Sequence, residues 1–157
     1  MKYLALIAST TKNYSGWIPD FDGAIWATAP TLEKLCERLS QALALYFLEL
    51  ETIPAPRAKQ LKDIPEDDLE GYETAPLLEF IEPALVNPVS LEIAQGIENR
   101  GLNKSELARR LGVTAAAVGR LADQFYWGHS LSSIRKVANE LNASLEVKLK
   151  LNHKNRA

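Results

Sequence analysis

The sequence predicts an α+β protein of two domains, in which a β-β-β-α-β domain precedes a helical domain with a helix-turn-helix and a final β-strand. Three observations lead to this prediction. Short apolar segments separated by turn residues fill the first thirty positions, and a long amphipathic segment follows them. Residues 104–121 have the spacing of two short helices joined at a glycine. Charge also divides the chain, because residues 1–89 carry a net charge of −7 and residues 90–157 a net charge of +5.

The first three strands are short apolar segments with polar or turn-forming residues between them. We expect them over residues 3–9, 14–18 and 24–28. The run Pro-Asp-Phe-Asp-Gly at positions 19–23 has the chemistry of a turn, so the strands should form an antiparallel meander. Residues 58–72 are acidic and are expected to be an exposed loop, and residues 77–81 should be the fourth strand.

A long helix is expected to begin after Thr31. The side chain of Thr31 can accept hydrogen bonds from the first free N–H groups, and Glu33 lies where the helix dipole favours an anion. Apolar residues recur every three or four positions between 32 and 50, so one face of the helix should lie on the sheet. Pro54 and Pro56 should end the helix.

Composition argues against several functions. The chain has one cysteine, Cys36, on the apolar face of the long helix, which indicates packing and a reducing compartment rather than a nucleophile or a disulfide. Its apolar segments are too short for a signal peptide or a membrane span, so we expect a soluble cytoplasmic protein. With two histidines, no glycine-rich phosphate loop and Asp20 and Asp22 confined to a turn, we expect no catalytic residue, metal or cofactor.

The second half begins after a proline-containing linker. Ser90 should cap a helix that ends before Gly101, and a further helix is expected over residues 130–141. The predicted organisation is a first domain, a linker, a helical domain and a tail, over residues 1–82, 83–89, 90–151 and 152–157.

The helix-turn-helix is centred on Gly112, which tolerates the left-handed backbone that ends the first helix. Ala108 falls at the crossing point, where a larger side chain would hold the helices apart. The apolar residues that the pair should bury are Leu107, Ala108, Leu111, Val113, Val118 and Leu121. Such a unit usually presents its second helix to the major groove of DNA, although one that serves only dimerisation remains an alternative.

The C-terminal segment over residues 144–151 alternates between apolar and polar positions, as a half-buried strand does. The apolar positions are Leu145, Val147, Leu149 and Leu151. A helical domain offers this strand no partner, so we expect it to pair with its copy in a homodimer or a larger homo-oligomer.

Two separate segments resemble the HicB antitoxin family. In the first half, YSGWIPDFDGAIWAT followed by PTLEKLCERLSQALALYFLE contains the family's Pro-Asp-x-x-Gly turn and its Thr-Leu-Glu helix start. In the second half, the helix-turn-helix and the closing SLSSIRKVANELNASLEV are similar to the helix-turn-helix form of the family's C-terminal domain. The chain departs from the family at Ala29 and Pro30, where Gly-Asp is usual, and at three alanines where the second helix usually carries a polar residue.

The resemblance implies a type II antitoxin. Its first domain, a truncated RNase H-like fold, would inhibit HicA, a small basic toxin that cleaves mRNA, and its second domain would repress the protein's own operon. Candidate toxin contacts are Trp17, Asp20, Phe21, Asp22 and Trp26, although the aromatic residues among them also suit core packing. The alternative is a stand-alone transcriptional regulator whose first domain senses a ligand or a protein.

The DNA contacts are expected on and around the two short helices. Candidate phosphate contacts are Lys104, Ser105, Arg109 and Arg110. Candidate base contacts are Thr114, Arg120, Gln124 and His129, with Ala115 able to touch a thymine methyl group. Because alanine neither donates nor accepts a hydrogen bond, we expect limited sequence specificity and a strong dependence on salt.

Overall fold

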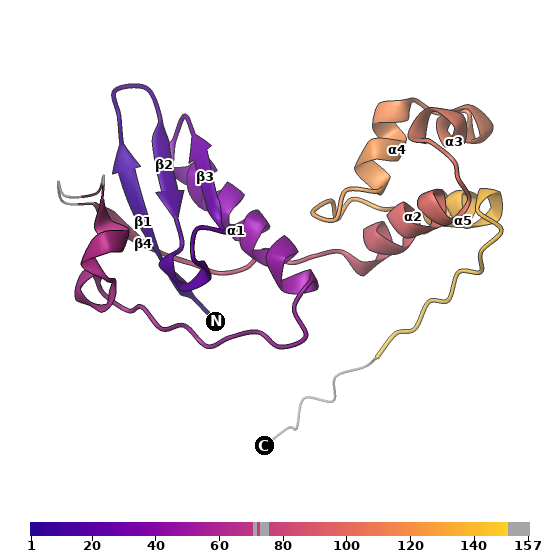
Figure 1. The fold of residues 1–157 in the computed structure, drawn as a ribbon. Coiled ribbons are helices and arrows are strands. Elements are labelled where there is room, and N and C mark those ends of the chain that lie inside the picture. Colours follow the sequence, from indigo (N-terminus) through magenta and orange to yellow (C-terminus); the bar gives the residue numbers. More distant parts are fainter. Residues whose placement is uncertain (71, 73–75, 151–157) are drawn as a thin grey trace, which may run out of the picture. The chain divides into compact units, whose positions relative to one another are not determined.

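The computed structural model, which describes residues 1–70, 72 and 76–150, divides the chain into two compact units (Figure 1). Unit 1 ends at Val86, and unit 2 begins at Asn87. Unit 1 contains β1 (Tyr3–Ser9), β2 (Tyr14–Trp17), β3 (Trp26–Ala29), α1 (Leu32–Leu48) and β4 (Leu77–Ile81). Unit 2 contains α2 (Pro88–Asn99), α3 (Lys104–Leu111), α4 (Ala115–Leu121) and α5 (Leu131–Glu140). Among the described residues, no helix has the length and apolar character that crossing a membrane requires.

The sheet of unit 1 has the strand order β3-β2-β1-β4, and each neighbouring pair is antiparallel. The predicted order β-β-β-α-β is therefore confirmed. The connection between β2 and β3 is longer than expected. Pro19–Phe21 form a 3-10 turn in it, and Asp22 and Gly23 adopt positive φ angles of 47° and 80°. For this reason β2 ends at Trp17 instead of residue 18, and β3 begins at Trp26 instead of residue 24.

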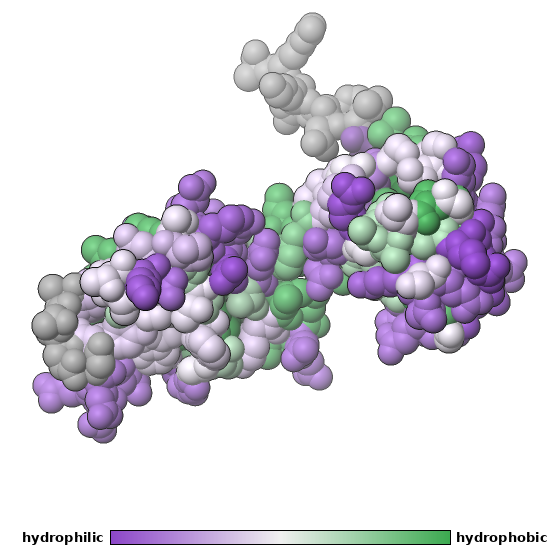
Figure 2. Space-filling view, turned by 90° about the horizontal axis from the view of Figure 1, so that it is seen from above, coloured by the Kyte–Doolittle hydropathy of each residue, from purple (hydrophilic) through white to green (hydrophobic). Residues whose placement is uncertain are grey.

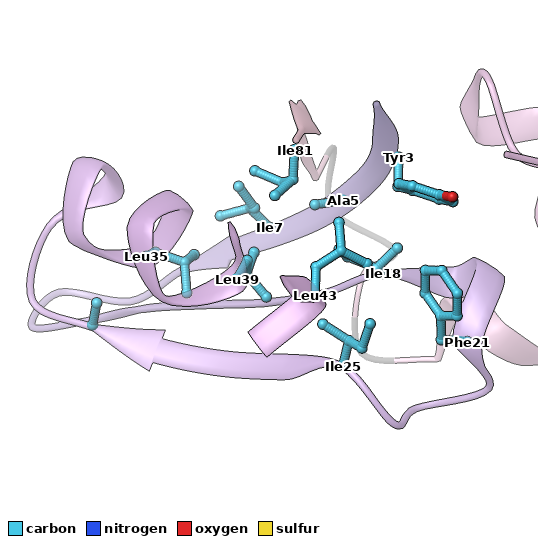
Figure 3. Packing of buried hydrophobic residues seen from close by; sticks show 11 residues of the cluster. Tyr3, Ala5, Ile7, Ile18, Phe21, Ile25, Leu35, Leu39, Leu43 and Ile81 are labelled. Atoms are coloured by element: carbon cyan, nitrogen blue, oxygen red, sulfur yellow. The ribbon is translucent and has the colours of Figure 1, made fainter. Parts of the chain in front are cut away.

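The main core of unit 1 lies between the sheet and α1. Figure 3 shows side chains of β1 and β4 pointing toward side chains of α1. The helix approaches β2 closely at Gly16, where a Cβ atom would lie 3.1 Å from side-chain atoms of both Ile7 and Leu35. Glycine at this position therefore sets the spacing between helix and sheet.

The start of α1 agrees with the sequence prediction, and its end does not. Thr31 is the N-cap, and its hydroxyl accepts a hydrogen bond from the backbone N–H of Lys34 at 3.2 Å. The helix ends at Leu48, so the expected apolar position at Leu50 lies beyond it. The chain is then held to β1 by the Tyr3 hydroxyl, which donates to the carbonyl oxygen of Pro54 at 2.6 Å.

The segment over residues 58–70 is largely exposed, as expected, but it is anchored to the sheet and is not an irregular loop throughout. Two short 3-10 helices, Leu61–Asp63 and Glu66–Leu69, lie within it. Its residues Ala58 and Ile64 are buried in a second apolar cluster on the sheet, against Leu4 and Leu6. Because α1 covers the other face, the sheet of unit 1 is covered on both sides.

Unit 2 is helical, and its first helix starts earlier than expected. Asn87, not Ser90, is the N-cap of α2, and its side-chain oxygen accepts from the backbone N–H of Val89 at 3.0 Å. Pro88 occupies the first helical turn, where the missing N–H costs nothing. The last helix, α5, lies within the predicted range of 130–141, with Ser130 as its N-cap.

Residues 144–150 form no strand within the single chain. After α5 the segment runs without helix or strand (Figure 1). The predicted strand needs a second copy as its hydrogen-bonding partner, so the pairing stays a prediction. Leu151 lies outside the described residues.

Candidate nucleic-acid and partner interfaces

The two short helices α3 and α4 are joined by a tight turn with a cap at each end. Asn103 accepts a hydrogen bond from the backbone N–H of Glu106 at 2.8 Å and begins α3. Gly112 has φ of 69° and ends α3, as the sequence predicts. Thr114 then begins α4, because its hydroxyl accepts from the backbone N–H of Ala117 at 3.1 Å.

The contact between α3 and α4 uses most of the predicted apolar residues. Leu107, Ala108 and Val118 are buried, and Leu111 and Leu121 pack partly buried against them. Val113 is the exception. It is 46% exposed, because it lies in the turn between the two helices.

On the outer face of the pair, α3 carries basic side chains and α4 carries mostly small ones. Lys104, Ser105, Arg109, Arg110, Thr114, Ala115 and Arg120 are all exposed. Arg110 donates to the carboxylate of Glu106 at 2.6 Å, one turn earlier on the same helix. Figure 2 looks onto the side of unit 2 where Figure 1 places α3 and α4, and hydrophilic surface lies there beside pale-green surface.

Two predicted base contacts, His129 and Gln124, lie in the segment that follows α4. The imidazole of His129 lies among groups of unit 2, with Nε2 2.9 Å from the carbonyl oxygen of Leu121 and 3.2 Å from Oγ of Ser90. Its Nδ1 lies 3.3 Å from the side-chain nitrogen of Asn87. The carbonyl of Gln124 also accepts from the backbone N–H of Asn87, at 2.7 Å. This network holds the segment after α4 to the start of α2, so the imidazole of His129 has a structural role within unit 2. Only the backbone of Gln124 takes part, and its side chain stays a predicted base contact.

The predicted partner contacts of unit 1 separate into buried and exposed residues. Phe21 is buried in the core. The side chain of Asp20 is 5% exposed, and its carboxylate accepts from the backbone N–H groups of Arg57 and Ala58, each at 3.0 Å. These two residues are therefore structural, while Asp22 and Trp26 remain exposed. Among the described residues, no three His, Cys, Asp or Glu side chains come together as a metal ion would need.

A groove of about 330 Å³ lies on the face of the sheet away from α1. Trp17 and Trp26 are register partners on β2 and β3 and both line it. Tyr72, Asp68 and Glu70 line it from the segment that follows α1. Sequence reasoning missed these three residues, and the only signal was their place in the acidic segment.

Within this groove, aromatic and acidic side chains meet. The rings of Trp17 and Tyr72 have centroids 6.4 Å apart. Burial raises the pKa of the Tyr72 hydroxyl, and a hydrogen bond to Ser15 partly offsets the rise, so the phenol stays protonated at neutral pH. Asp68 and Glu70 are exposed beside the rings.

The predicted dimerisation residues lie at the end of the described chain. Leu145 is half-buried and lines a groove of about 470 Å³ beside α2 and α5. Val147 and Leu149 continue the alternation and are 58% and 92% exposed.

Comparisons with known proteins include a weak likeness to a solved structure. No protein-family model and no curated protein matches the chain. A chain of a solved structure titled "HicA3 and HicB3 toxin-antitoxin complex" is similar, at 24% sequence identity and a TM-score of 0.41. The likeness covers 53% of this chain and 98% of that chain. We draw no conclusion from so low a score.

Proposed function

We propose that this protein is an antitoxin of the HicB kind. In this proposal, unit 1 binds and inhibits a small basic toxin that cleaves mRNA, and unit 2 binds the operator DNA of the same operon. The observation that carries the proposal is that the boundary of charge coincides with the boundary between the folded units. The net charge is −7 up to Val86 and +5 from Asn87 onward.

The charge of unit 1 suits a basic partner. A protein that binds RNA presents a basic surface, and a surface of opposite charge speeds docking and fixes its register. The strand order of unit 1, with one long helix on one face, is compatible with the truncated RNase H-like fold that the resemblance implies. The proposal assigns no catalytic residue to unit 1 and no bond chemistry to the chain.

The charge of unit 2 suits DNA, with α3 and α4 acting as a helix-turn-helix. Lys104, Ser105, Arg109 and Arg110 would contact phosphates and so position the domain without reading sequence. Base reading would fall to Thr114 and Arg120 at the exposed side of α4. Because Ala115 offers a base only its methyl group, most of the binding free energy would come from phosphate contacts and would fall steeply with salt.

A homodimer completes the DNA-binding role, because helix-turn-helix proteins commonly read two half-sites related by twofold symmetry. In the proposal, residues 144–151 of two copies pair as antiparallel strands. The exposed apolar side chains of Val147 and Leu149 support this role, since pairing would cover them.

Co-expression tests the antitoxin role. The neighbouring open reading frame should encode a short basic protein that arrests growth, and this chain should restore growth and form a stable complex with it. The purified chain should also protect RNA from the neighbour in a cleavage assay. A neighbour that neither binds the chain nor is inhibited by it contradicts the antitoxin role and favours a stand-alone regulator.

Gel-shift titrations test the operator role. The full chain should bind its own upstream DNA more tightly than a scrambled duplex of the same length, across a series of salt concentrations. Equal affinity for the two duplexes would exclude operator recognition.

A further inference from the structure

We infer that the groove formed by Trp17, Trp26, Tyr72, Asp68 and Glu70 seats an arginine side chain of the basic protein that unit 1 binds. The inference rests on the proposed function and specifies the chemistry of its contact. It concerns a groove on the face of the sheet away from α1, and three of its lining residues, Asp68, Glu70 and Tyr72, were not singled out by the sequence.

The strand register places two tryptophans side by side. Trp17 and Trp26 are directly paired across β2 and β3, so their Cβ atoms lie within about 4.5–5.5 Å of each other on one face of the sheet. Trp26 is 66% exposed, although a large aromatic side chain normally gains free energy from burial. The cost of leaving Trp26 in water is recovered when a partner covers it.

The second cluster explains why the groove stays open beside Trp26. Ala58 and Ile64 bury Leu4 and Leu6, and the covering segment then reaches Trp17 with Tyr72. Trp26 is not part of this cluster. The space between the covering segment and β3 is therefore bounded by aromatic rings on the sheet side.

The charge of the groove favours a cationic side chain as its occupant. Asp68 and Glu70 line the same groove as the aromatic residues, within a unit of net charge −7. Aromatic faces attract cations through the ring quadrupole, and carboxylates attract them directly. A guanidinium group satisfies both, because it is planar, stacks on rings and donates two parallel hydrogen bonds to a carboxylate. Lysine offers a point charge without a stacking plane and should bind more weakly.

The three tryptophans of the chain provide the readout. In an NMR titration of the full chain with a short arginine-glycine peptide, the indole N–H signals of Trp17 and Trp26 should shift. Trp127 lies in unit 2 and serves as the internal reference. The same peptide with citrulline in place of arginine keeps the shape and removes the charge, and it should bind about tenfold more weakly. Unmoved signals of Trp17 and Trp26, or equal shifts with the citrulline peptide, would overturn the inference.

Two matched pairs of substitutions distinguish an effect of the groove from an effect of the overall negative charge. Asp68→Asn with Glu70→Gln should abolish the arginine-dependent shifts and weaken the complex with the basic neighbour about tenfold. Glu66→Gln with Asp67→Asn removes the same charge from the same segment, outside the groove lining, and should change neither. If the two pairs weaken binding equally, the groove contributes only through its charge, and the inference is contradicted.

The inference and the proposed function can fail separately. If the Asp68 and Glu70 variant inhibits the neighbour as well as the wild type, the toxin contact lies elsewhere and only the inference fails. If the arginine peptide binds the groove but the chain neither binds nor inhibits the neighbour, the antitoxin assignment fails. A Trp26→Ala variant gives a further check of arginine binding. Because Trp26 is exposed, the substitution removes one ring of the groove and leaves the fold intact.

Discussion

The carboxylate of Asp20 accepts a hydrogen bond from the backbone N–H of Ala58 at 3.0 Å, across 38 positions of sequence. Its second oxygen accepts from the backbone N–H of Arg57 at the same distance. Both oxygens are thus in use, and the side chain is almost fully buried. Asp20 therefore fastens the turn between β2 and β3 to the start of the segment that covers the second face of the sheet.

Asp20→Asn should lower the free energy of unfolding of unit 1 by about 1–3 kcal/mol, because the amide nitrogen cannot accept one of the two hydrogen bonds. Urea unfolding followed by tryptophan fluorescence measures this loss. Asp22→Asn makes the same chemical change two positions later, at an exposed residue where asparagine tolerates the positive φ angle, and should leave stability within about 0.5 kcal/mol. Equal stability of the two variants would show that the Asp20 contacts are not stabilising.

The sequence predicts the periodic elements of this fold well. β1 and the start of α1 appear where their apolar patterns place them, and Thr31 and Ser130 mark helix starts that the structure retains. Apolar periodicity and helix caps are local signals, since each depends on residues within one or two turns of the chain.

Long-range contacts explain what the sequence did not reveal. Ala58 and Ile64 are isolated apolar residues in an acidic segment, and no period marks them as buried. Ser90 and Asn87 both suit a helix cap, and the choice between them is made by tertiary contacts, because Ser90 is fully buried against His129. The role of Asp20 depends on backbone groups nearly forty positions away.

His129 should matter for the stability of unit 2 rather than for base reading. Because the Leu121 carbonyl can only accept, Nε2 donates to it, and Nδ1 accepts from the Asn87 amide. His129→Ala should lower the free energy of unfolding by about 1–3 kcal/mol, since it leaves buried polar groups without partners. Asn139→Ala, on the exposed side of α5, is the control. At temperatures where both variants are folded, their preference for operator over scrambled DNA should match the wild type, and a lost preference in His129→Ala would restore His129 as a base contact.

Arg109 and Arg120 should contribute differently to DNA binding. Arg109→Ala should weaken binding to operator and scrambled DNA alike and reduce the slope of log affinity against log salt by about 1, as the loss of a phosphate contact does. Arg120→Ala should lower the preference for the operator by about 1–3 kcal/mol, as the loss of a base contact does. Lys34→Ala removes one positive charge from α1 of unit 1, which carries none of the proposed DNA contacts, and should change neither quantity. Identical profiles for the two arginine variants would contradict the division of roles.

Cys36 should react slowly with thiol reagents. Burial raises the pKa of its thiol, and the negative charge of Glu79 raises it further. The thiolate is the reactive form, so at pH 8 Cys36 should be labelled more slowly than free cysteine, and the difference should shrink as pH rises above the pKa of the thiol. Labelling in urea, where the helix is unfolded, should match free cysteine. Faster labelling of the folded chain than of free cysteine would instead indicate an activated thiol.

The C-terminal segment should hold the dimer through its apolar side. Leu149 is 92% exposed in the single chain, so an aspartate there costs the monomer nothing but would place a charge among apolar side chains in the paired strands. Leu149→Asp should therefore sediment as a monomer at concentrations where the wild type sediments as a dimer. Lys148→Asp changes the neighbouring residue on the other side of the alternation and should remain dimeric. Hydrogen exchange gives an independent check, because strand pairing should protect alternate backbone N–H groups of residues 145–150 in the wild type and not in Leu149→Asp.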